Sequence, residues 1–205
     1  MKNDTTYNVI KYAIEAVLFK IKGSKFLSFA YPILSEQEAK EIIERLKKQY
    51  YQAHHCCYAY QIGIDKNYFR IHDDGEPKNT AGAPIYGQIQ SFNLSHILVV
   101  VIRYFGGTKL GVGGLLNAYK TAAQMALEQA VIIEKTINIH YIIHFDYKNI
   151  NQVMRIIKEK NIYIVLQNLE KNPCTVEIAV PKNNNNTIFN LFNTLHEINI
   201  GLKEN

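Results

Sequence analysis

A glycine-rich segment at residues 103–114, with the sequence RYFGGTKLGVGG, holds the residue types best suited to binding an anion. Glycine lets the backbone approach a ligand closely, and free N–H groups at the start of a helix favour negative charge. The spacing fits neither the phosphate loop of nucleoside triphosphatases nor the dinucleotide-binding fingerprint. The alternative is that these glycines serve only a tight turn and close helix packing. The predicted anion or phosphate-backbone site comprises Arg103, Gly106, Gly107, Lys109, Gly111, Gly113 and Gly114.

A second segment, at residues 72–77, places three carboxylates within four residues: Asp73, Asp74 and Glu76. Such a cluster could hold a divalent cation or take part in acid–base chemistry. The alternate ligands and closing glutamate of an EF-hand loop are missing. No nucleophile with an obvious base lies alongside, which favours a polar turn whose aspartates cap the backbone. We therefore assign no catalytic residue.

The run from His54 to Cys57 (HHCC) invites a zinc interpretation. In a strand, successive side chains point to opposite faces, so each face would receive at most two of the four ligands that a structural zinc site needs. We predict no metal and no other cofactor. A buried cysteine pair accounts for the run more simply.

The elements that must position these segments follow from hydrophobic periodicity. Ser35 and Glu38 form a capping box, which predicts the start of a helix. A boundary is expected near residues 133–138, followed by a strand–helix–strand–strand–helix–strand order, the ferredoxin-like motif. The pattern before the boundary predicts strands at 13–34 (two, joined at Gly23-Ser24), 53–62, 68–71 and 97–102, and helices after Ser35, at 81–92 and after Gly114.

Composition limits the class of protein. The chain has 205 residues, 47% of them hydrophobic and 20% charged, which is typical of a globular protein. Three cysteines, two of them adjacent, cannot form a disulfide framework. We expect a cytoplasmic protein with neither a signal peptide nor a membrane span. The net charge is +5, and residues 1–135, with 16 Lys and Arg against 12 Asp and Glu, carry +4 of it.

Four motifs stand out along the chain: His54-His55-Cys56, residues 72–77 (HDDGEP), Thr80-Ala81-Gly82-x-Pro84, and above all residues 101–111 (VIRYFGGxxLG). In these motifs the chain resembles the YigZ/IMPACT family, and the likeness covers nearly the whole chain. One position departs from the family pattern, because Asn79 stands where a glycine is expected before Thr80-Ala81-Gly82.

The resemblance implies an α+β protein of two domains. Residues 1–135 would form an IMPACT-like domain with the fold shared by a ribosomal small-subunit protein and domain IV of elongation factor G. Residues 136–205 would form a ferredoxin-like domain similar to the last domain of that factor. The surface that the family motifs would form comprises His55, Asp73, Asp74, Gly75, Glu76 and Pro77.

Three functions are compatible with these observations. Eukaryotic relatives in the family regulate translation, which favours a non-enzymatic protein that contacts RNA, the ribosome or a translation factor, without reading a DNA sequence. An enzyme acting on a phosphorylated small molecule would need Asp73, Asp74 and Glu76 to meet His55 and Arg103 in one cleft. A protein–protein adaptor could use the ferredoxin-like sheet, where Tyr141, Tyr147 and Tyr163 would supply contact area. The sequence does not define the oligomeric state.

Overall fold

The computed structural model describes residues 5–203, which divide into two compact units. Tyr7–Lys135 make up the first unit, and residues 136–203, with residues 5 and 6, make up the second. Each unit combines helices with an antiparallel sheet, so the predicted α+β class with two domains is confirmed. None of the helices between residues 5 and 203 is both long and apolar enough to cross a membrane.

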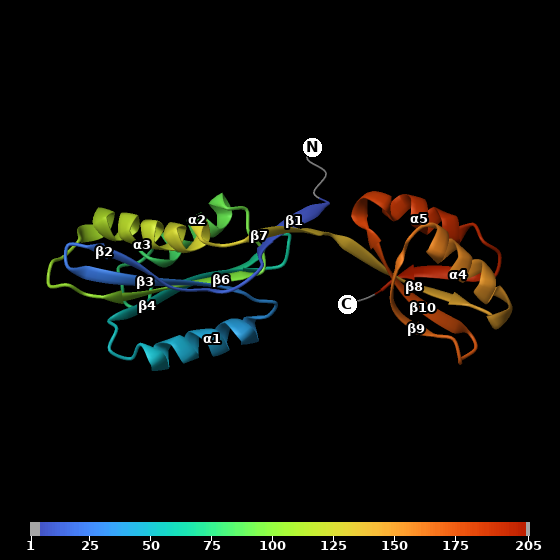
Figure 1. Cartoon of the computed structure of the whole chain (residues 1–205), viewed down its shortest axis with the longest axis horizontal. Coiled ribbons are helices and arrows are strands. Elements are labelled where there is room, and N and C mark those ends of the chain that lie inside the picture. The colour runs from blue at the N-terminus through green and yellow to red at the C-terminus, as the bar shows by residue number, and fades with distance from the viewer. Residues whose placement is uncertain (1–4, 204–205) are drawn as a thin grey trace. The chain divides into compact units, whose positions relative to one another are not determined.

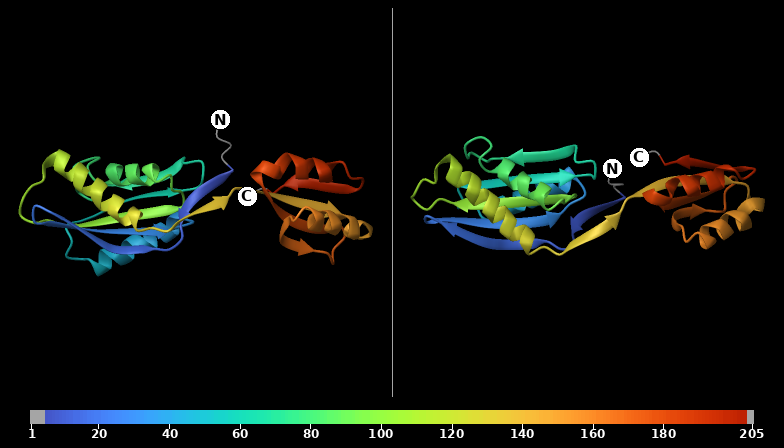
Figure 2. Two further views of the ribbon diagram at one scale, coloured as in Figure 1. Left: turned by 45° about the horizontal axis from the view of Figure 1, so that its top comes forward. Right: turned by 90° about the horizontal axis from the view of Figure 1, so that it is seen from above.

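The first unit is built on a five-stranded sheet in which every neighbouring pair is antiparallel. Figures 1 and 2 show two helices, α2 and α3, on one face of this sheet and α1 on the other. In sheet order the strands are β2 (Ile14–Ile21), β3 (Ser24–Pro32), β6 (Ile97–Tyr104), β4 (His55–Ile62) and β5 (Tyr68–His72). The helices are α1 (Glu36–Gln49), α2 (Gly82–Ser91) and α3 (Gly111–Glu128).

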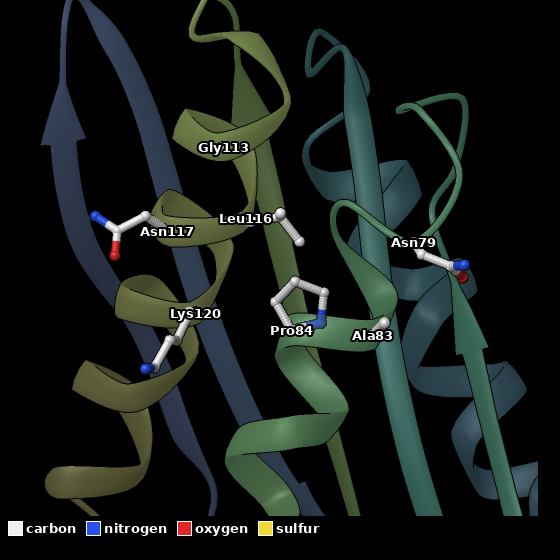
Figure 3. A pocket seen from close by; sticks show the side chains of 7 residues that line it. All are labelled: Asn79, Ala83, Pro84, Gly113, Leu116, Asn117 and Lys120. Carbon is white, nitrogen blue, oxygen red and sulfur yellow. The ribbon is translucent and has the colours of Figure 1, made fainter.

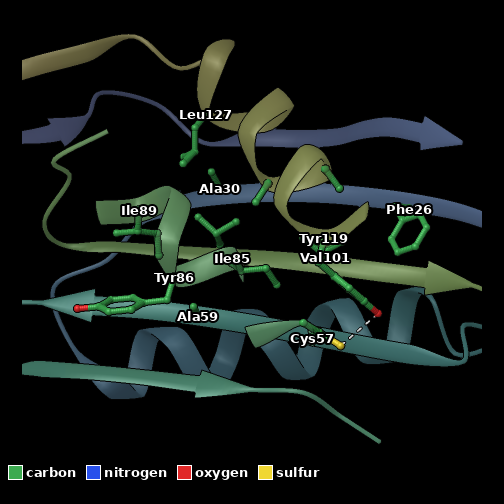
Figure 4. Close-up of a cluster of buried hydrophobic side chains, with 14 of the residues drawn as sticks. Phe26, Ala30, Cys57, Ala59, Ile85, Tyr86, Ile89, Val101, Tyr119 and Leu127 are labelled. Atoms are coloured by element: carbon green, nitrogen blue, oxygen red, sulfur yellow. Dashed lines mark hydrogen bonds between the residues drawn. The ribbon is translucent and has the colours of Figure 1, made fainter. Parts of the chain in front are cut away.

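Two buried clusters hold these layers together. Figure 4 shows the cluster between the sheet and helices α2 and α3, where the alanines of α3 allow close approach to β3. A second cluster lies between α1 and the other face. Because β6 is central and covered on both faces, all but its last residue are buried, as its uninterrupted apolar sequence predicts.

Helix α1 begins where the capping box predicts. The Ser35 side chain accepts a hydrogen bond from the Glu38 N–H, and the Glu38 carboxylate accepts one from the N–H of Leu34. Two glutamates in the first turn and two lysines in the last complement the helix dipole.

The sequence analysis missed a two-stranded sheet formed by β1 (Thr6–Ile10) and β7 (Ile132–Thr136). Both strands are only five residues long, and most residues of β7 are exposed. A short exposed strand carries little periodic signal, and this pair joins segments more than a hundred residues apart.

The second unit has the strand and helix order of the ferredoxin-like motif. Its sheet order is β11-β8-β10-β9, every pair is antiparallel, and α4 and α5 pack on one buried cluster. The strands are β8 (Asn138–Phe145), β9 (Tyr163–Asn168), β10 (Cys174–Pro181) and β11 (Ile198–Leu202). The helices are α4 (Ile150–Glu159) and α5 (Asn185–Asn193), each preceded by a 3-10 turn, at Tyr147–Asn149 and Lys182–Asn184.

The assignment of Tyr141 to an adaptor surface on this sheet is wrong. Tyr141 is buried on the helix side, where its hydroxyl donates a hydrogen bond to Asn185. It therefore belongs to the core. Tyr147 and Tyr163 are exposed.

Candidate functional site

The strand directions of the first unit bring all the sequence motifs to one end of its sheet. Strands β2, β5 and β6 end there, and β3 and β4 begin there. The β2–β3 turn, residues 54–57, residues 72–77 and the glycine-rich segment therefore lie together, although they are up to about 90 positions apart in sequence. We call this the motif end of the sheet.

The centre of the motif end is a buried ion pair between Glu76 and Arg103. The Arg103 Nη1 atom lies 2.5 Å from Glu76 Oε1, and both side chains are at most 6% exposed. The Tyr119 hydroxyl donates a hydrogen bond of 2.8 Å to the same oxygen. His55 Nε2 lies 3.7 Å away. Arg103, one of the predicted anion-site residues, is thus already paired with a carboxylate of the protein.

Burial keeps Tyr119 a hydrogen-bond donor in this network, and two aromatic rings lie against the Arg103 guanidinium. Burial raises the pKa of the Tyr119 phenol far above neutral pH, and Cys57 and Glu76 add to the shift, so the hydroxyl stays protonated and donates. The Arg103 guanidinium lies over the rings of Phe26 and Phe105, at 5.5 and 5.6 Å from their centroids. Cation–π contacts of this kind stabilise a buried arginine.

The other two carboxylates of the acidic segment bind the backbone. Asp73 Oδ1 accepts hydrogen bonds from the N–H groups of Ala81 and Gly82 at the start of α2, and its Oδ2 accepts one from Asn79. Asp73 therefore performs the capping role that the polar-turn alternative described.

The Asp74 side chain instead contacts the start of β4 and helix α1. It accepts a hydrogen bond of 2.7 Å from the Cys56 N–H and forms an ion pair of 2.8 Å with Lys47. Burial raises the pKa of Asp74, but the contacts with Lys47 and Cys56 outweigh it and hold this pKa below its ordinary value. The three carboxylates thus point to three different partners. The enzyme hypothesis needed all three carboxylates beside His55 and Arg103, and only that of Glu76 lies beside both.

The departure at Asn79 is explained by its backbone. Asn79 has φ +64°, in the left-handed region where glycine is favoured and asparagine is the best tolerated of the other residues. Its N–H still reaches Asp73. The turn therefore has, at Asn79, a backbone conformation that favours glycine.

The glycines of the candidate anion site serve different purposes. A β-carbon on Gly106 would lie 1.9 Å from the carbonyl carbon of Gly23, so Gly106 is required for the close approach of two turns. Gly107 and Gly111 have φ +83° and +72°, which other residues rarely adopt. A β-carbon on Gly114 would come 3.0 Å from Leu110 Cβ. At Gly113, by contrast, a β-carbon would meet no atom of the described residues within 4 Å.

A cavity of about 330 Å³ joins the acidic and glycine-rich segments. Helix α3 starts at its edge, and among the described residues no side chain caps the first turn, which also lacks acidic residues. Its free N–H groups therefore remain available to an anion. Lys109 is exposed beside them, and the Nε of Arg103 has no hydrogen-bond partner within residues 5–203. The cavity is lined by Glu76, Arg103, Phe105, Lys109, Gly111 and Val112, with Pro77, Leu110 and Leu115.

Gly113 lies on a different, open pocket of about 420 Å³ between the start of α2 and α3, shown in Figure 3. Of the predicted anion-site residues, Arg103, Lys109 and Gly111 therefore line the first cavity and Gly113 the second pocket, while Gly106, Gly107 and Gly114 line neither. This pocket is lined by Asn79, Ala83 and Pro84 on one side and by Gly113, Leu116, Asn117 and Lys120 of α3 on the other.

The cysteines pack as the strand argument predicts. Cys56 and Cys57 enter the clusters on opposite faces of the sheet. Burial raises the pKa of Cys56 to about 11 and also raises that of Cys57, so both thiols are protonated at neutral pH. Figure 4 shows the hydrogen bond that the Cys57 thiol donates to the Tyr119 hydroxyl. The same hydroxyl donates a hydrogen bond to Glu76.

Sequence reasoning missed several residues of the motif end. Tyr119 lies within the helix predicted after Gly114, and nothing local marks it as a partner of Glu76. Ser24 Oγ accepts hydrogen bonds from Arg103 Nη2 and from the Gly106 N–H, a contact across some 80 positions. Three lysines around the β2–β3 turn, Lys20, Lys22 and Lys25, could have been recognised from their spacing as a basic hairpin.

Fold and site together define a two-domain α+β protein whose glycine-rich and acidic motifs share one buried ion pair and one cavity. Residues 22–127 match the family model of the Impact N-terminal domain. The chain belongs to the IMPACT family, as its motifs suggested.

Two relatives and one solved structure illustrate the likeness. The chain is 38% identical over 130 residues to the IMPACT family member YvyE of Bacillus subtilis, covering 63% of this chain and 59% of that protein. It is 32% identical over 147 residues to the IMPACT family member YigZ of Escherichia coli, covering 71% and 72%. A crystal structure described as that of a hypothetical protein aligns over 98% of both chains, with a TM-score of 0.74 and 24% identity.

Proposed function

We propose that this protein is a cytoplasmic, translation-associated regulatory protein that binds RNA, on its own or within the ribosome, at the motif end of its first unit. The observation that carries the proposal is the uncapped start of α3, which opens with exposed Lys109 onto the cavity beside Arg103. Membership of the IMPACT family, whose eukaryotic members regulate translation, supports the same assignment.

The charges at this cavity favour a phosphate ligand. Its one carboxylate, Glu76, is already paired with Arg103, so Lys109 and the helix start leave a net positive site. The surrounding residues 1–135 carry +4 of the net charge. Phosphate contacts of this kind provide affinity and orientation without reading sequence.

Arg103 holds this site in place. Its ion pair with Glu76 and its hydrogen bond to Ser24 join β6, the acidic segment and the β2–β3 turn. Replacing Arg103 would therefore disturb folding as well as binding. Lys109, which is exposed, tests binding alone.

The test measures binding of ribosomal particles and of purified RNA across salt concentrations, for the wild type, Lys109→Gln and Lys11→Gln. Lys11 lies before β2, at the opposite end of the sheet, and serves as the charge-matched control. We expect affinity to fall steeply with salt, and Lys109→Gln to reduce the slope of log K against log salt by roughly 0.7–0.9, the value of one lost phosphate contact. Salt-insensitive binding, or equal effects of the two variants, contradicts the proposal.

A further inference from the structure

On the α1 side of the sheet, part of the motif end is left uncovered. The cluster beneath helix α1 includes residues of β3, β6 and β4 but, among the described residues, none of the edge strand β2. Leu18 of β2 is 44% exposed and Phe105, just after β6, is 39% exposed. A cavity of about 420 Å³ lies here, lined by Leu18, Gly23, Lys25, Leu27, Tyr104 and Phe105.

The strand register places two like charges directly opposite each other at this surface. Lys20 of β2 pairs with Lys25 of β3, and Lys25 pairs in turn with Tyr104 of β6. These three side chains therefore share one face. Like charges directly opposite in an antiparallel pair destabilise a sheet, so the fold itself gains nothing from this arrangement. A local rule broken without a structural gain is characteristic of a binding site.

The chemistry of the surface is aromatic and basic. Phe105 is exposed and Tyr104 is partly exposed where it packs against the cluster beneath α1, and Lys22 in the turn adds a third lysine to Lys20 and Lys25. Among the described residues that line the cavity, none is acidic. Aromatic side chains beside lysines suit an unpaired nucleic-acid strand, in which bases stack on rings while phosphates meet the cations. A second copy of this chain would bring the same lysines and be repelled.

Phe105 connects this cavity with the one at the start of α3, because it lines both. One face of its ring lies near the Arg103 guanidinium, whose centre is 5.6 Å from the ring centroid. A phosphate at the start of α3 and a base beside Phe105 would thus bind to adjoining sites, as they do in neighbouring nucleotides.

We propose that the surface formed by Lys20, Lys22, Lys25, Tyr104 and Phe105 binds an unpaired segment of RNA by stacking its bases on the two aromatic rings. This inference rests on the proposed function, since it extends the same strand from the α3 site. It makes the ligand single-stranded, because bases within a duplex are not available to the rings.

Binding of the full chain to a labelled single-stranded oligouridine and to a duplex RNA of the same length tests the inference. We expect the single strand to bind more tightly. Phe105→Leu should weaken single-strand binding by about 5- to 100-fold, the value of one stacked base. Tyr12→Leu, which changes an exposed aromatic residue at the opposite end of the sheet, should leave it unchanged.

The double variant Lys20→Gln/Lys25→Gln separates binding from folding. It removes a repulsive pair, so we expect its resistance to urea to equal or exceed that of the wild type while the salt slope falls by about 1.4, or two contacts. Crosslinking of an oligonucleotide that contains 4-thiouridine should map to the peptide with Tyr104 and Phe105.

Several outcomes would overturn the inference: equal affinity for duplex and single strand, an unchanged affinity of Phe105→Leu, crosslinks only elsewhere, or a change of oligomeric state in the lysine variant. If Lys109→Gln weakens RNA binding while Phe105→Leu does not, the proposed stacking of bases is wrong, but the proposed phosphate site at the start of α3 is still supported. If the wild type binds no RNA, both proposals fail.

Discussion

At Glu76, one carboxylate oxygen accepts hydrogen bonds from both the Arg103 guanidinium and the Tyr119 hydroxyl, and the Glu76 and Arg103 side chains are almost fully buried. Two buried charges are tolerated there because each satisfies the other and additional hydrogen bonds support the pair. The pair connects β6, the acidic segment and α3. Its main contribution is to fix the position of elements that flank the candidate site.

Removal of one partner should therefore be costly. We expect Arg103→Met to lower the free energy of unfolding by about 3–5 kcal/mol, because Glu76 is left as an unpaired buried charge. The double variant Arg103→Met/Glu76→Leu should recover much of that loss, since no buried charge remains. Urea unfolding followed by circular dichroism measures both. A loss below about 1 kcal/mol in the single variant would show that the pair is not buried in solution.

At the scale of elements, helix α3 and the turn before it contain glycines with opposite requirements. Gly106, in the turn before it, is in backbone contact with Gly23, whereas Gly113 in the first turn of the helix has open space around it. Glycine within a helix costs stability relative to alanine because its unfolded chain is freer. Gly113 thus weakens the helix without a packing reason in the described residues.

The two positions should respond to alanine in opposite directions. Gly113→Ala should raise the free energy of unfolding by about 0.5–1 kcal/mol, the difference in helix propensity. Gly106→Ala should lower it by about 1–3 kcal/mol or more, because two turns must move apart. Thermal and urea unfolding of the two variants side by side measures the contrast. Destabilisation by Gly113→Ala would mean that the space beside it is filled.

Most elements could be predicted from the sequence because their signals are local. The capping box at Ser35, the apolar run of β6 and the alternation of β8 all depend on residues close together. The candidate site could be predicted only in part. The pairing of Glu76 with Arg103 depends on strand directions and on contacts across dozens of residues, which no local pattern encodes. The same is true of the placement of Gly111 and Gly113 on different pockets.

At the scale of the whole molecule, each unit has its own core. The cluster of residues 139–200 contains no residue of the two clusters in the first unit, within the described chain. A unit with its own core can lose stability without affecting another. The roles of the units can therefore be tested separately in the intact protein.

Phe192→Ala provides such a test. Phe192 is fully buried in the second unit, and its truncation should destabilise that unit by about 3–5 kcal/mol. Hydrogen exchange of the intact chain should show lost protection in residues 136–203 and unchanged protection in residues 7–135. Equal loss in both would show that the two units unfold together.

The long sequence separation within the motif end also has a consequence for synthesis of the protein. Ser24, Glu76, Arg103 and Tyr119 meet only in the folded unit, and Tyr119 is the last of them to leave the ribosome. Until then a nascent chain exposes the lysine hairpin and the glycine-rich turn without the helix that completes them. Contacts this distant form late in folding. The motif end can therefore be completed only after α3 has been made, and a chain that stalls earlier carries the lysines of the β2–β3 turn without the tyrosine that completes the Glu76 network.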